Sequence, residues 1–113
     1  MRNPKWLREE IILALDLYFD AERGGMSATN PKIIALSETL NNLKLIIDRS
    51  DAVRFRNPNG VTLKLCNFMA FDKTYTGLGM RSGSKLDKIL FDEFFDNRKK
   101  LQEQAFKIRQ SLA

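Results

Sequence analysis

Histidine is absent from this 113-residue chain, and cysteine occurs once, as Cys66. Without histidine there is no Ser-His-Asp or Cys-His nucleophile system and no His-ligated metal site. A single cysteine excludes an internal disulfide and a thiolate zinc cluster. A glycine-rich phosphate loop ending in Lys-Ser or Lys-Thr is also missing. We therefore expect no catalytic residue, no metal site and no cofactor in this chain.

Long apolar runs are lacking too, since no segment approaches the roughly 20 residues that cross a bilayer. The N-terminus has no secretory apolar region, because Glu9 and Glu10 interrupt the pattern at once. With one cysteine, this predicts a protein of the reducing cytoplasm and no membrane partner. An apolar share of 43% and a charged share of 29% are typical of a globular protein, so residues 1–113 are predicted to form a single domain.

Helix-start signals and apolar spacing predict an all-α fold, a compact bundle of about five helices. Asn-Pro pairs at residues 3–4, 30–31 and 57–58 can begin helices over residues 5–21, 31–42 and 58–71. The first is apolar around most of its circumference, which is typical of a buried central helix. Within the third, Leu63-Lys64-Leu65 in isolation also fits an alternating strand. Residues 44–54 fit a frayed helix end, a short extended piece or an anchored loop.

Ser84 and Asp96 are predicted to cap a fourth and a fifth helix. The two apolar stripes are Leu86, Ile89, Leu90 and Phe94, and Leu101, Ala105, Ile108 and Leu112. Five phenylalanines are interpreted as core, with a platform for stacking bases as the alternative: Phe71, Phe91, Phe94, Phe95 and Phe106. Cys66 is interpreted as a small buried side chain. Asp16, Asp20 and Glu22 are better explained by helix solubility than by metal binding.

The net charge of +5 is unevenly distributed along the chain. Residues 1–52 carry seven Lys/Arg and eight Asp/Glu, whereas residues 53–113 carry twelve and six. Most of the excess lies within residues 53–91. A positive field confined to one section favours a polyanionic partner, and the alternative is a solvated surface with a chance imbalance.

The candidate DNA-binding residues surround the start of the third helix and continue into the glycine-containing loop after it. Lys and Arg neutralise phosphates, and Arg54 and Arg56 are expected to do so, while Asn and Arg can also bind base edges. A second helix crossing the backbone and a third reading bases would form a helix-turn-helix-like core. The loop could instead be a plain connector, and residues 98–100 are the alternative basic location. The full set is Arg54, Arg56, Asn57, Asn59, Thr62, Lys64, Asn67, Lys73, Tyr75, Arg81 and Lys85.

Two long blocks also resemble a bacterial family. The segment WLREEIILALDLYF, residues 6–19, is similar to the opening of the N-terminal domain of McrA-like HNH restriction endonucleases. The segment FRNPNGVTLKLCNF, residues 55–68, resembles their second signature, and residues 77–83 and 86–94 match in order. The resemblance implies a phage-defence module that recognises duplex DNA, including modified DNA, ahead of a C-terminal HNH nuclease module. Because an HNH site needs histidines, no catalytic residue is carried over, and the chain is either an excised N-terminal domain or a free-standing relative of this family.

Two other functions remain open. An apolar excess around Phe91, Phe94 and Phe95 could dock a partner protein or a second copy of the chain, giving an interaction domain or a homodimer. A DNA-binding transcription regulator would share the chemistry of the recognition module and differ only in what is attached. Salt dependence of binding separates DNA binding from apolar docking, because phosphate contacts release counterions.

Overall fold

The computed structural model describes residues 3–43, 53–74 and 83–111, and these contain five α-helices and no strand. This confirms the expected all-α class and the approximate number of helices. The helices are α1 (Arg8–Tyr18), α2 (Pro31–Leu43), α3 (Pro58–Met69), α4 (Lys85–Phe95) and α5 (Arg98–Gln110).

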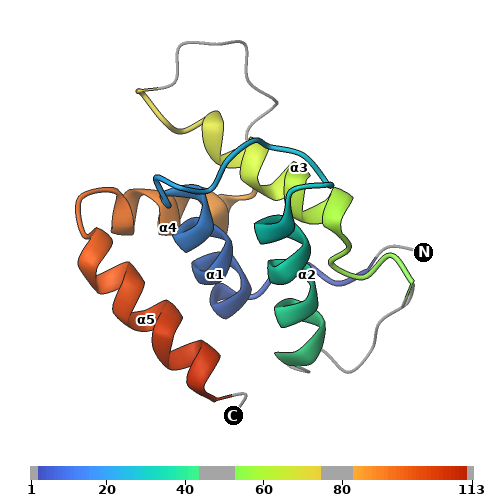
Figure 1. Ribbon diagram of the computed structural model, residues 1–113. Helices are drawn as coiled ribbons and strands as arrows, with labels where there is room; N and C mark the ends of the chain where they lie inside the picture. Colours follow the sequence, from blue (N-terminus) through green and yellow to red (C-terminus); the bar gives the residue numbers. More distant parts are fainter. Residues whose placement is uncertain (1–2, 44–52, 75–82, 112–113) are drawn as a thin grey trace.

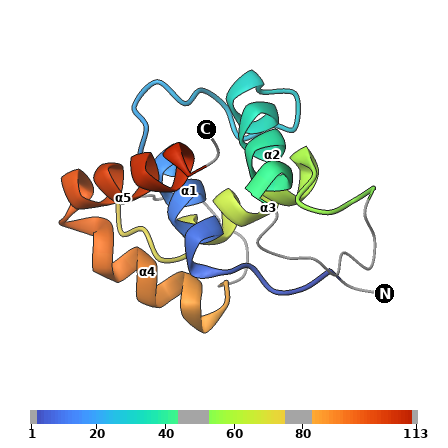
Figure 2. The same cartoon turned by 90° about the horizontal axis from the view of Figure 1, so that it is seen from below.

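Helix α1 lies at the centre of the bundle and contacts each of the other four helices. In both views α4 and α5 lie on one side of α1, and α2 and α3 lie on the other (Figures 1 and 2). Eight of its eleven residues are buried, which confirms the central position expected from its nearly continuous apolar surface. The aromatic part of the core is centred on Phe91, whose ring lies 5.5–6.5 Å from five other aromatic rings: Tyr18, Phe19, Phe68, Phe71 and Phe95.

The predicted starts of α2, α3 and α4 are confirmed, but α1 begins later than expected. It starts at Arg8 rather than at residue 5, and it ends at Tyr18. The backbone N–H of Leu7 donates to Glu10 Oε1 at 2.8 Å, so the acidic third residue of the helix caps its start. Helix α5 is preceded by Asn97, not by Asp96, which instead ends α4.

Helices α2 and α3 pack against each other, as a helix-turn-helix-like core requires. However, fourteen residues separate Leu43 from Pro58, whereas the turn of such a motif usually has three or four. Only the packing of the two helices therefore corresponds to the motif. For residues 44–54 the sequence left three interpretations open. Residues 44–52 lie outside the described residues, and so does Leu112.

Two apolar residues assigned to the core are on the surface instead. Ile89 is 58% exposed and Phe106 is 60% exposed. Conversely, Phe91 and Phe94 are buried in the core, so they form no exposed apolar patch for a partner. Among the described residues, no helix has the length and apolar character needed to cross a membrane.

Candidate nucleic-acid interface

Arg56 lies in the turn before α3, with its guanidinium buried against Glu10 of α1. Its Nε donates to Glu10 Oε2 at 2.8 Å and its Nη2 donates to Oε1 at 3.0 Å. The two side chains are only 4% and 2% exposed. This burial contradicts the expectation that Arg56 contacts a phosphate. The physical reason is that a buried carboxylate must be paired, and Glu10 is paired by Arg56.

The backbone at Arg56 is held in a conformation that is unusual for a residue with a side chain. Its φ of +47° lies in the left-handed region. The hydroxyl of Ser37 on α2 donates to the Arg56 carbonyl at 2.7 Å, and this bond is buried. The turn that carries Arg56 is therefore fixed from two sides, by α1 through the side chain and by α2 through the carbonyl.

Lys64 forms a second internal ion pair, between α3 and α4. Its Nζ donates to Asp87 Oδ2 at 2.9 Å and to Oδ1 at 3.1 Å. Asp87 is fully buried and the Lys64 side chain is 12% exposed. Oδ2 of Asp87 also accepts from the backbone N–H of Ser84 at 2.9 Å. A Cβ on Gly83 would lie 2.4 Å from Asp87 Oδ2, so only glycine fits there.

The two pairs meet at Trp6. The Arg56 guanidinium carbon lies 4.9 Å from the Trp6 ring centroid, and the Lys64 Nζ lies 5.1 Å from it. Both distances are within the range of cation–π attraction. We call this group, consisting of Trp6, Glu10, Arg56, Lys64 and Asp87, the Trp6 cluster. The expectation that Lys64 reads bases from an exposed face conflicts with its place in this cluster.

The remaining predicted residues of α3 differ in how far they reach the surface. Asn57 caps the helix, its Oδ1 accepting from the N–H of Gly60 at 2.8 Å. The Thr62 hydroxyl donates to the Pro58 carbonyl at 2.8 Å and is half-buried. Asn67 is also half-buried, whereas Asn59 is exposed. The expectation that the polar residues of α3 are not all buried is confirmed, but among them only Asn59 is fully at the surface.

Three predicted DNA-binding residues outside α3 are on the surface: Arg54, Lys73 and Lys85. Tyr75 and Arg81, in the glycine-containing loop, lie outside the described residues. Cys66 is half-buried, not fully buried, and burial raises the pKa of its thiol. No group of three or more His, Cys, Asp or Glu residues that could hold a metal occurs in residues 3–43, 53–74 and 83–111.

A second basic surface lies on α5. This helix carries five bases and a single acid, Glu103, and its first turn contains no acidic residue. Arg109 pairs with Asp16 of α1 at 3.0 Å. The others are exposed, and within the described part of the chain Lys99, Lys100 and Lys107 form no salt bridge. We call Arg98, Lys99, Lys100 and Lys107 the basic face of α5.

Sequence reasoning named residues 98–100 only as an alternative location and did not name Lys107. The signal that could have found the whole face is the ratio of bases to acids within one predicted helix. Basic side chains at a helix start also interact unfavourably with the helix dipole. Three consecutive basic residues at that position therefore indicate a binding role rather than a contribution to helix stability.

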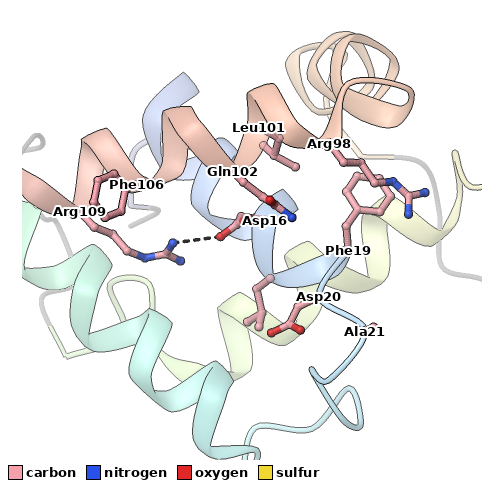
Figure 3. A pocket seen from close by; sticks show the side chains of 10 residues that line it. Asp16, Phe19, Asp20, Ala21, Arg98, Leu101, Gln102, Phe106 and Arg109 are labelled. Carbon is pink, nitrogen blue, oxygen red and sulfur yellow. Dashed lines mark hydrogen bonds and ion pairs between the residues drawn. The ribbon is translucent and has the colours of Figure 1, made fainter.

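A groove of about 650 Å³ separates α5 from the C-terminal half of α1 (Figure 3). It is lined by ten residues: Asp16, Leu17, Phe19, Asp20, Ala21, Arg98, Leu101, Gln102, Phe106 and Arg109. At one end the Arg98 guanidinium carbon lies 4.3 Å from the Phe19 ring centroid. Asp20 is paired with Lys32, whose hydrogen bond lowers the pKa of the carboxyl group. This groove was not anticipated from the sequence.

The chain matches no protein-family model, and neither the curated proteins nor the solved structures with which it was compared gave a match.

Proposed function

We propose that this chain is a DNA-binding target-recognition module that holds the phosphate backbone of duplex DNA through the basic face of α5. The observation that carries the proposal is the set of exposed bases on one helix with a single acid among them. Two of the basic residues predicted to bind DNA near α3 are instead neutralised inside the protein, Arg56 and Lys64 in the Trp6 cluster. The basic residues of α5 therefore form a group of exposed positive charges that can attract a polyanion.

The position of these bases on the helix supports the same partner. Arg98, Lys99 and Lys100 occupy the first turn, where unpaired backbone N–H groups already create a positive potential. In the free protein these like charges repel each other and the helix dipole. A phosphate bound there would relieve both effects and accept hydrogen bonds from side chains and backbone.

The resemblance to McrA-like HNH restriction endonucleases supports the biological setting of the proposal. In that setting the parent protein also contains an HNH nuclease module. The chain delivers that nuclease to duplex DNA that carries base modifications. The chain contains no histidine, so it would supply the binding and the nuclease module would supply the HNH site.

The experiment compares two triple variants that remove the same charge from different surfaces. The first variant removes the lysines of α5 and is Lys99→Ala/Lys100→Ala/Lys107→Ala. The second removes the exposed basic residues that were predicted to bind DNA near α3 and α4, and is Arg54→Ala/Lys73→Ala/Lys85→Ala. Fluorescence anisotropy with a random duplex over a series of salt concentrations gives affinity and salt slope. We expect the α5 variant to bind about tenfold or more weakly and its slope to fall by about 0.9 for each phosphate that the variant no longer neutralises.

The matched variant should bind nearly as wild type does. If it alone loses affinity, the phosphate-binding residues lie near α3 and the role of α5 is wrong. If wild-type protein shows no salt-dependent binding to duplex DNA, the proposed function is wrong altogether.

A further inference from the structure

The groove between α1 and α5 contains an aromatic side chain that the fold does not use. Phe106 is 60% exposed although it lines the groove together with buried Leu101 and Leu17. On α5 the groove residues Arg98, Gln102, Phe106 and Arg109 recur at three- and four-residue spacing, so they form one stripe, which shares Arg98 with the basic face. A large exposed aromatic next to a concave surface is typical of a binding site.

The polar groups of the groove balance each other in charge. Asp16 is paired with Arg109, and Asp20 is paired with Lys32 (Figure 3 shows the first pair). With two carboxylates and two arginines in its lining, the groove has no excess of positive charge for a phosphate, whereas the basic face has one. The groove therefore suits an uncharged, partly apolar group that is connected to an anion outside it.

We infer that the groove between α1 and α5 binds an unpaired nucleobase of a DNA strand whose phosphates lie on the basic face of α5. A base is flat and apolar on its faces and carries donors and acceptors on its edge. Phe106 can stack on a face, while Gln102 and the Asp16 and Asp20 carboxylates can bind the edge. The volume of about 650 Å³ is within the range of small-molecule sites. This inference rests on the proposed function.

The orientation of Arg98 is consistent with this division between base and phosphate. Its guanidinium carbon lies over the Phe19 ring, 4.3 Å from the centroid, and 5.3 Å from the Phe95 centroid. It is therefore held at the end of the groove, where the groove meets the first turn of α5. A guanidinium in this position can donate to a phosphate oxygen next to the bound base.

The test measures preference for an unpaired base. Two duplexes are compared, one fully paired and one of the same sequence with a single bulged 2-aminopurine, whose fluorescence reports stacking. Wild-type protein should bind the bulged duplex more tightly and quench its fluorescence. Phe106→Ala should reduce the preference by about five- to 150-fold, the range measured when a stacking aromatic is truncated, and should leave binding to the paired duplex unchanged.

Two control variants keep the result specific. Ile89→Ala removes a comparably exposed apolar side chain from α4, 58% exposed, and should change nothing. Phe106→Trp retains a stacking surface and should restore the preference. Because Phe106 is exposed, these variants should fold normally, which circular dichroism would verify.

The outcomes separate this inference from the proposed function. If wild type binds paired duplex through the α5 lysines but does not prefer the bulged duplex, the inference is wrong and the proposed function stands. The inference is also wrong if Phe106→Ala abolishes a concentration-dependent dimer in sedimentation, since the groove would then hold a second copy. If no DNA is bound at all, both are wrong.

Discussion

In the sequence, the basic residues in and next to α3 and those of α5 look equally able to bind a polyanion, but their surroundings in the fold differ. Lys64 of α3, and Arg56 just before it, are paired inside the protein with Asp87 and Glu10. The lysines of α5 are exposed, and within the described residues they have no carboxylate within salt-bridge distance. The difference teaches that the number of bases in a segment does not give the charge of its surface.

The cause lies in the acids that each helix meets. Helix α3 contacts both α1 and α4, and each of these turns one carboxylate inward, where it must be paired. Helix α5 packs on α1 mainly through apolar residues, and Asp16 neutralises only Arg109. The section of the sequence in which most DNA-binding residues were predicted therefore has two of its charges neutralised in the core.

The largest expected effect is the loss of stability on breaking the Trp6 cluster. Arg56→Ala leaves Glu10 buried without its cation, so we expect the free energy of unfolding to fall by about 3–5 kcal/mol. Urea denaturation followed by circular dichroism measures this. The double variant Arg56→Ala/Glu10→Ala should be destabilised by less than the sum of the two single variants. A change below about 1 kcal/mol for Arg56→Ala would mean that the pair is not buried in solution, and the contrast with α5 would disappear.

A smaller effect tests whether α3 retains any part in reading bases. Asn59 is the exposed polar residue of its predicted set. If α3 is a reader, Asn59→Ala should cost about 1–3 kcal/mol on a preferred DNA site and little on random duplex. The preferred site would first be selected from a random library. Equal affinity of wild type and variant for the selected site would assign recognition to another surface and sharpen the contrast between the helices.

The smallest effect concerns an exposed ion pair that serves as a reference for the buried one. The Arg8 side chain is 44% exposed and pairs with Glu93 at 2.9 Å. We expect Arg8→Ala to cost about 0.2–1 kcal/mol at pH 7. The hydrogen bond from Arg8 lowers the pKa of Glu93, against the opposing effect of burial. The contribution is therefore complete above the unfolded pKa, about 4.3, and is lost as the pH falls through the lower folded pKa.

Unfolding curves of wild type and Arg8→Ala recorded between pH 7 and about pH 2.5 would measure this dependence. The stability difference should shrink toward zero at the acidic end. A difference that stays constant as the pH falls would show that Arg8 stabilises the fold by packing on Phe94, whose ring centroid lies 5.8 Å from its guanidinium carbon, rather than through Glu93.

Local signals in the sequence were sufficient for the helices, because each start depends on a few neighbouring residues. Asn57 accepts from Gly60 three positions later, and Ser84 accepts from Asp87 at the same spacing. The start of α1 was misplaced because Glu10 caps it from inside the helix, while the Asn-Pro pair at residues 3–4 lies outside it. Capping by Glu10 instead of by the Asn-Pro pair moves the start of α1 but does not change the fold.

The candidate site was less accessible to sequence reasoning, because its charges depend on partners far away in the chain. Arg56 and Glu10 are 46 residues apart, and Lys64 and Asp87 are 23 apart. No periodicity within α3 reveals that these carboxylates point inward. The exposure of Phe106 could have been predicted, because helical spacing places it away from the apolar stripe formed by Leu101, Ala105, Ile108 and Leu112.

The Trp6 cluster also gives the protein a built-in spectroscopic reporter. Trp6 is the only tryptophan of the chain, and two cations lie close to its ring. Its emission therefore reports directly on the arrangement of the ion pairs that join α1, α3 and α4, without any attached dye. A titration with unlabelled DNA could follow the wavelength of that emission. A ligand held by α5 should leave the wavelength unchanged, whereas one that rearranges the turn before α3 should shift it.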